Sequence, residues 1–154
     1  EISDLVQPLR VVIDGAARLS PDYKIFSTPG DVLLATRADP ADDYVQAMRA
    51  VGADTLTLGS IGEHIDLVAL LSELASRDIN EVHCECGPNL GGALLEAKLV
   101  DELLLYTAPH LLGHGATPLV HLKALSSMAE RTSLKIHEVT RIGDDLRVRL
   151  RPTI

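Results

Sequence analysis

EVHCECGPNLGGALLEAKLVDELLLYTAP, residues 81–109, combines an apolar strand pattern, a Gly-Pro turn, a helical run and a second strand. The first strand is expected over 81–85, the helix from about residue 89 to 98, and the second strand over 102–109. Two neighbouring strands joined through a helix normally form a parallel, right-handed crossover. Residues 81–108 therefore predict the core of a parallel sheet.

Segments on the N-terminal side continue the alternation of strand and helix. Short β-branched runs bounded by Gly or Pro predict strands over 9–14, 31–36 and 54–60. Between the last two, a helix should begin with acidic residues after Pro40 and end at Gly52. A second helix, apolar at helical spacing, should follow the strand at 54–60. It is expected to run from Ile65 to about Arg77, where a cation suits the helix dipole.

The C-terminal segments have a different pattern. Residues 133–140 and 145–150 alternate apolar with polar side chains, which predicts an antiparallel hairpin with one solvated face. Together the segments predict a three-layer α/β fold, with a mostly parallel sheet, helices on both faces and this antiparallel C-terminal hairpin.

Length and charge narrow the classes of function. The chain has 154 residues, 46% hydrophobic, which suits one domain. A net charge of −8 opposes binding to nucleic acid. No apolar run is long enough to cross a bilayer, and residues 1–10 lack a secretion signal, so a cytoplasmic protein is expected. Two cysteines make no disulfide framework and suggest a reducing compartment.

His83, Cys84, Glu85 and Cys86 could form a metal cluster, or the turn after them could bind phosphate. In a strand, His83 and Glu85 point to one face and Cys84 to the other, and the chain offers no second ligand pair for structural zinc. No metal site is therefore expected. Free cysteine is usually a small buried hydrophobe, the role expected for Cys84 and Cys86.

The Gly-Pro turn supports the phosphate hypothesis. A strand ending at Gly87, Asn89 as an N-cap and two glycines in the first turn would present free N–H groups to an anion. Alternatively, Gly87 and Gly91 serve only tight packing of the helix on the sheet. The spacing alone leaves both interpretations open.

Three histidines, His110, His114 and His121, lie in or near a Gly-rich loop, PHLLGHGATP. They could in principle bind a metal, although no ligand helix supports it. The alternative is a surface loop that closes over an active site or shapes a subunit contact.

GPNLGGALLEAKLVDELLLYTAPHLLGHGATPL, residues 87–119, resembles the reductase domain of the bifunctional riboflavin-biosynthesis deaminase/reductase, which has a dihydrofolate-reductase-like fold. PLRVVIDGAARLSPDYKIF, residues 8–26, resembles an earlier strand and loop of that domain. The resemblance runs from about Pro8 to Leu150. It implies NADPH-dependent reduction of 5-amino-6-(5-phosphoribosylamino)uracil to the ribitylamino product, coupled in the intact protein to deamination of the diaminopyrimidine precursor. It also favours the loop interpretation for the three histidines, and a homodimer.

The resemblance also implies site residues. It places a substrate contact at Glu85. Its NADPH-phosphate loop falls on Gly87, Pro88, Asn89, Leu90, Gly91, Gly92 and Ala93. Gly15 stands where the family commonly has a cofactor-contacting Ser, so a side-chain contact is lost there. No catalytic side chain is assigned, because the cofactor carries the hydride.

The sequence also departs from the family. Ahead of the strand at Leu9 the family has a further strand and helix, a Trp-containing segment and basic residues, and none of these has a counterpart here. The zinc signature of the family's deaminase domain is also missing. We therefore expect residues 1–154 to be the C-terminal part of one NADPH-dependent reductase domain, inactive alone, with zinc only in the absent deaminase domain. The alternatives are another dihydrofolate-reductase-like reductase, of a pterin or pyrimidine, and a nucleotide-binding module without turnover.

Overall fold

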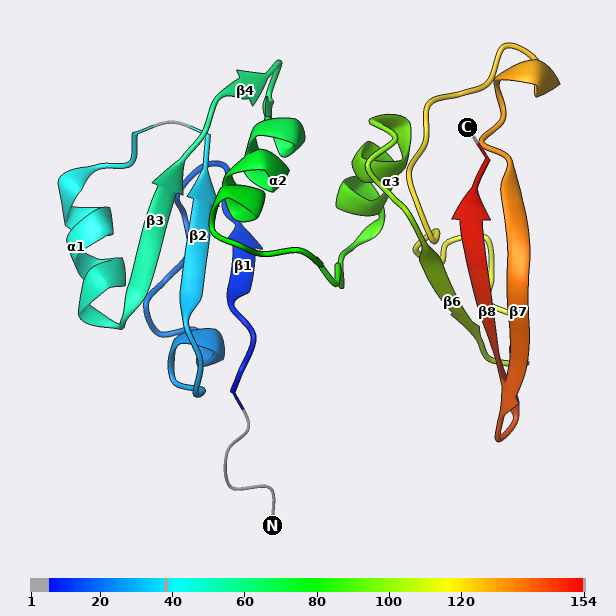
Figure 1. Ribbon diagram of the computed structural model, residues 1–154, viewed down its shortest axis with the longest axis horizontal. Helices are drawn as coiled ribbons and strands as arrows, with labels where there is room; N and C mark the ends of the chain where they lie inside the picture. Colours follow the sequence, from blue (N-terminus) through cyan, green and yellow to red (C-terminus); the bar gives the residue numbers. More distant parts are fainter. Residues whose placement is uncertain (1–5, 38, 154) are drawn as a thin grey trace. The chain divides into compact units, whose positions relative to one another are not determined.

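The computed structural model describes residues 6–37 and 39–153. The chain divides into two compact units, Glu1–Glu81 and Val82–Ile154, and each is described by itself. Figure 1 labels most of the helices and strands of both. Among the described residues, no helix has the length and apolar character that a membrane span requires.

The first unit is built on a parallel sheet of β1 (Arg10–Ile13), β2 (Val32–Thr36) and β3 (Ala53–Thr57), in the order β1-β2-β3. All five residues of the central strand β2 are buried. Such burial on both faces explains why β2 is a continuous apolar run rather than an alternating one. These strands confirm the predicted ones, although β3 ends at Thr57, before the predicted end at residue 60.

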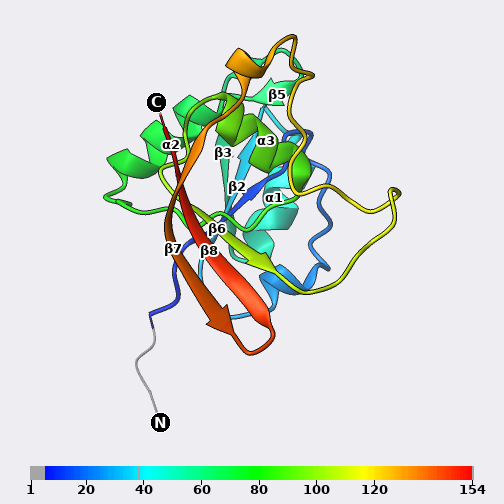
Figure 2. The ribbon, with the colours of Figure 1, turned by 90° about the vertical axis from the view of Figure 1, so that its right-hand side faces the viewer.

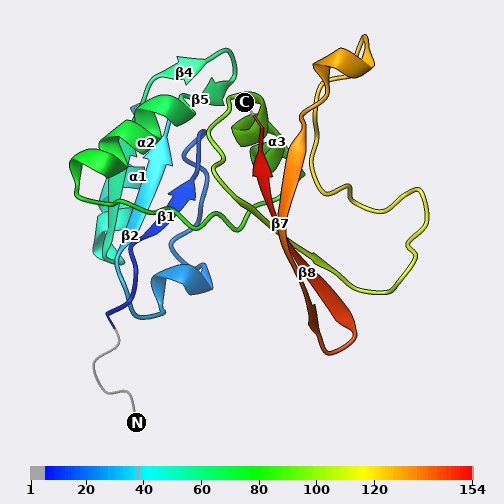
Figure 3. The same ribbon diagram turned by 45° about the vertical axis from the view of Figure 1, so that its right-hand side comes forward.

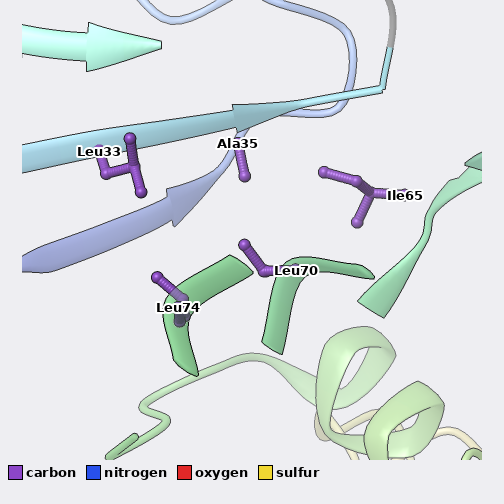
Figure 4. Packing of buried hydrophobic residues seen from close by; sticks show 5 residues of the cluster. All are labelled: Leu33, Ala35, Ile65, Leu70 and Leu74. Carbon is purple, nitrogen blue, oxygen red and sulfur yellow. The ribbon is translucent and has the colours of Figure 1, made fainter. Parts of the chain in front are cut away.

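Two helices cover the two faces of this sheet. On one face, α2 (Leu67–Ser76) contributes Leu70 and Leu74, which pack with Ile65 against Leu33 and Ala35 of β2 (Figure 4). On the other face, α1 (Asp42–Ala50) buries Met48 against Val32, Leu34 and Ala53 of the sheet. The first unit therefore has the three layers that the sequence predicts.

The ends of both helices follow local chemistry. Asp66 caps α2, its carboxylate accepting the N–H of Ala69 at 2.9 Å. The α1 helix has Asp42 and Asp43 in its first turn and is followed by Gly52, whose φ of +80° stops it. Both helices confirm the predictions. Three short elements complete the unit: the 3-10 helix η1 (Lys24–Phe26), and β4 (Ser60–Ile61) paired with β5 (His64–Ile65).

The second unit contains helix α3 (Pro88–Glu96), strand β6 (Leu103–Thr107), the 3-10 helix η2 (Met128–Glu130) and the hairpin of β7 (Leu134–Ile142) and β8 (Asp145–Pro152). Its sheet is antiparallel, with β8 between β6 and β7 (Figure 2). The hairpin confirms the prediction (Figure 3). Gly143, with φ of +63°, takes the first position of the two-residue turn, where a positive φ is needed.

The predicted strand over 81–85 is wrong, and so is the parallel crossover over 81–108. Residues 81–87 form no strand and are exposed, and in the described part of the chain β6 pairs with β8 alone, antiparallel. A strand depends on hydrogen bonds to a neighbouring strand more than on its own composition. Among the described residues of the second unit, no such neighbour lines residues 82–87.

Candidate anion-binding turn and ligand pocket

The turn that leads into α3 leaves two backbone donors free. Gly87 is the N-cap and Pro88 occupies the first helical position, where its missing N–H costs nothing. The first helical hydrogen bond runs from the N–H of Gly91 to the carbonyl of Gly87, at 3.1 Å. Within residues 6–37 and 39–153, the N–H groups of Asn89 and Leu90 have no acceptor. Two free donors at the positive end of a helix dipole suit an anion.

The prediction of Asn89 as the N-cap is wrong. The N-cap is Gly87, which has no side chain to occupy the first-turn donors. Asn89 lies inside the helix, exposed, and its Oδ1 is 2.6 Å from Nδ1 of His121. The donors are therefore free because the cap is a glycine.

The three glycines of the turn have different surroundings. A Cβ at Gly87 would meet nothing within 4 Å, whereas one at Gly91 would touch Val120 Cγ1 at 3.4 Å and Cys86 Sγ at 3.5 Å. A Cβ at Gly92 would lie 1.8 Å from the carbonyl oxygen of His121. The close packing at Gly92 is thus against the segment around His121, while Gly87 is open. The half-buried Ala93 follows in α3.

The segment before the turn is extended and exposed. The carboxylate of Glu85 lies 3.6 Å from Nε2 of His83, while Cys84 interacts with Cys86. The two pairs alternate along the chain, as an extended backbone requires. Glu85 is therefore accessible to a ligand, beside the free donors of the turn.

Cys84 and Cys86 are both exposed, so the prediction of buried cysteines is wrong. That prediction assumed a strand covered on both sides. Partial desolvation, together with a hydrogen bond to Cys86, raises the pKa of the Cys84 thiol to about 11. Because the thiolate is the nucleophilic form, Cys84 is poorly suited to covalent catalysis at neutral pH.

No group of three His, Cys, Asp or Glu side chains among the described residues is arranged to hold a metal ion. His110 and His114 are exposed, and His121 contacts Asn89 instead.

Gly15 lies in the first unit, directly after β1. It lines a cavity of about 470 Å³ where β1 and β2 end and α1 begins. The other lining residues are Ala16, Ala17, Arg37, Asp39, Pro40, Ala41, Asp43 and Tyr44. Open α/β sheets bind ligands at this carboxyl edge. A smaller cavity of about 150 Å³ lies beside Asp54 and Arg77, near the opposite end of β3, away from that edge.

Asp14 precedes the cavity residue Gly15 and holds the neighbouring residues in place. Its Oδ2 accepts the N–H groups of Arg18 and Leu19, at 2.7 and 2.8 Å, and the hydroxyl of Tyr44 at 2.9 Å. Burial raises the pKa of Tyr44, and the Asp14 carboxylate raises it further, so the phenol stays a neutral donor. Asp14 thus holds the loop after β1 in place. Sequence reasoning selected Gly15 but missed Arg37 and Tyr44, whose only signal was their position after β2 and at the start of α1.

A family described as RibD C-terminal domain matches residues 2–148. Riboflavin biosynthesis protein RibD of Escherichia coli is 37% identical over 143 residues, which is 93% of this chain and 38% of that protein. The 5-amino-6-(5-phosphoribosylamino)uracil reductase of Buchnera aphidicola subsp. Acyrthosiphon pisum is 32% identical, over 94% of this chain and 68% of the relative. A solved structure of Acinetobacter baumannii RibD superposes with a TM-score of 0.85 at 30% identity, covering 99% of this chain and 40% of that one.

Proposed function

Since the chain belongs to the RibD C-terminal domain family, we propose that it serves riboflavin biosynthesis by reducing 5-amino-6-(5-phosphoribosylamino)uracil to the ribitylamino product with NADPH. The observation that carries this proposal is the match to a Buchnera relative named for that reduction, which extends over 94% of this chain and 68% of the relative. The chain spans only 38% of the E. coli RibD protein, so coupling to a deaminase is part of the proposal.

The turn at Gly87 fits the phosphate of such a cofactor. The free N–H groups of Asn89 and Leu90 and the dipole of α3 would hold the anion, and the open space at Gly87 lets it approach the backbone. Gly91, Gly92 and Ala93 follow these donors in α3. When bound, NADPH supplies the hydride, which leaves binding and orientation to the protein.

Glu85 is our proposed substrate contact. It is exposed and two residues before the N-cap of α3, and its carboxylate can accept hydrogen bonds from ribose hydroxyls or from N–H groups of the pyrimidine. Nε2 of His83 lies 3.6 Å from this carboxylate, and both side chains are exposed. No proton transfer is assigned to Glu85.

Gly15 is our proposed second cofactor contact, made through the backbone in place of a side chain. Its cavity at the end of β1 offers the Arg37 cation, whose guanidinium donates to the carbonyl of Glu63, and the acidic side chains of Asp39 and Asp43. Mixed charge of this kind suits a ligand that carries both hydroxyl groups and phosphate.

Cytoplasmic location and a homodimer complete the proposal, the former in keeping with riboflavin synthesis from soluble metabolites. Sedimentation should show a dimer that dissociates on dilution. A monomer at all concentrations would remove the dimer from the proposal.

The test is NADPH oxidation by the purified full-length protein with the ribosylaminopyrimidine phosphate. We expect oxidation that depends on this substrate and is absent with a pterin. Oxidation with the pterin instead would identify a different reductase of the same fold. NADPH binding without turnover of either compound would identify a nucleotide-binding module.

A further inference from the structure

Residues 120–123 form a strap along α3, without helix or strand of their own (Figure 1). The strap is bonded to both ends of the helix. The N–H of His121 donates to the carbonyl of Pro88 at 2.9 Å, at the start of α3. The N–H of Lys123 donates to Oε1 of Glu96 at 2.7 Å, at its last residue. The strap therefore has a defined register on the helix.

Gly92 makes this close approach possible. The carbonyl oxygen of His121 occupies the space that a Cβ of residue 92 would need, at a separation of only 1.8 Å. Gly92 is the buried residue of α3, and it faces the strap midway between the two hydrogen-bonded ends. This approach brings the His121 side chain to the first turn of α3.

There the imidazole meets Asn89, with Nδ1 of His121 and Oδ1 of Asn89 separated by 2.6 Å. An amide oxygen can only accept, so in this contact Nδ1 of His121 carries the proton and donates it. The contact occupies the acceptor end of the Asn89 amide. Its donor end, the NH₂ group, has no partner among the described residues.

We propose that His121 is a positioning residue which, by holding the oxygen of Asn89, presents the amide NH₂ as a third donor to the anion bound at the turn. Without His121, either end of the Asn89 amide could face the turn before the anion binds, and only the nitrogen can donate to phosphate. The proposal rests on the proposed binding of a cofactor phosphate by Asn89 and Leu90. It adds His121, which does not touch the ligand itself but orients the Asn89 side chain that does.

The test is calorimetric titration of the purified protein with NADPH. His121→Leu removes the donor and should weaken NADPH binding by about threefold to tenfold, the change in affinity expected from the loss of one hydrogen bond. His121→Asn places an amide nitrogen near the position of Nδ1 and should restore binding to within about twofold of wild type. The matched control is His137→Leu, at the exposed bulge of β7, which should leave NADPH affinity unchanged.

A double-mutant cycle with Asn89→Ala separates positioning from a general structural effect. If His121 acts through Asn89, then His121→Leu should weaken NADPH binding no further in the Asn89→Ala background. An equal loss in both backgrounds, or no loss in a wild-type background that binds NADPH, would overturn the proposal.

If the wild-type protein binds no NADPH, the proposed function fails and the positioning contact is judged by NMR. The side-chain amide resonances of Asn89 should move in His121→Leu and stay at their wild-type positions in the control His137→Leu. Unchanged Asn89 resonances in His121→Leu would overturn the contact.

Discussion

The packing of His121 on Gly92 predicts a destabilising effect for the smallest possible substitution, Gly92→Ala. The added Cβ would lie 1.8 Å from a backbone oxygen, which cannot rotate away as a side chain could, so the strap must detach. Detachment removes three hydrogen bonds, from His121 N to Pro88, from His121 Nδ1 to Asn89 and from Lys123 N to Glu96. At about 1 kcal/mol net for each, the loss is about 3 kcal/mol.

Two further terms adjust this figure. Alanine is favoured over glycine inside a helix by about 1 kcal/mol, which offsets part of the loss. The exposed ion pair of Lys123 with Glu96 adds little. Gly92→Ala should therefore lower the free energy of unfolding by about 2 kcal/mol, the difference between the hydrogen-bond and helix-propensity terms.

Gly91→Ala is the matched control in the same turn of α3. Its Cβ would meet Val120 and Cys86 at 3.4 and 3.5 Å, which are ordinary contact distances, so only the helix-propensity gain of up to about 1 kcal/mol remains. Urea unfolding followed by circular dichroism would compare the two variants with wild type. A Gly92→Ala protein as stable as Gly91→Ala would refute the close packing of the strap.

Three other predictions concern the site and the hairpin. Glu85→Gln keeps the shape of the side chain but removes its charge, so turnover should fall more than NADPH affinity; equal losses in kinetics and calorimetry would move Glu85 out of the substrate site. Gly87→Val fills open space beside the free donors, so it should weaken NADPH binding by about tenfold or more. The urea midpoint should fall only slightly, because valine is a poorer N-cap than glycine. Unchanged affinity would argue against an anion at the turn. The pKa of Glu138 is lowered by a hydrogen bond from Thr140 and then by Arg147. Glu138 should therefore stabilise the fold above about pH 4.3, the ordinary pKa of glutamate in an unfolded chain. This stabilisation should be lost as the pH falls through the lower pKa that Glu138 has in the folded protein. In Glu138→Gln, the urea midpoint should change less with pH in the acid range than it does in wild type. An equal change with pH would contradict this role of Glu138.

Local sequence patterns were sufficient where an element is determined by its own residues. The α1 helix follows from acids after Pro40 and a glycine at 52, and the β7–β8 hairpin from its alternation and its turn at Gly143. The three layers of the first unit follow from the apolar run of β2, which is covered on both faces.

The errors arose where distant residues decide the outcome. The pattern over 81–85 suited a strand, but a strand also needs a hydrogen-bonded neighbour. The packing of Gly92 depends on His121, which no local pattern connects to it. One error was avoidable, because proline favours the first helical position and Pro88 therefore indicates Gly87, rather than Asn89, as the N-cap.

Residues 108–117 and the strap that follows them should differ in how well they tolerate inserted residues. Because its hydrogen bonds to Pro88 and Glu96 fix residues 120–123 on α3, the exposed stretch 108–117 only spans the gap between the end of β6 and the strap. Doubling the length of a flexible loop costs only about 0.6 kcal/mol in closure entropy. Residues inserted near Gly113 or Gly115, both open to solvent, should therefore leave the register of the strap on α3 unchanged. A single residue inserted between His121 and Lys123 would shift one anchor against the other and release the helix.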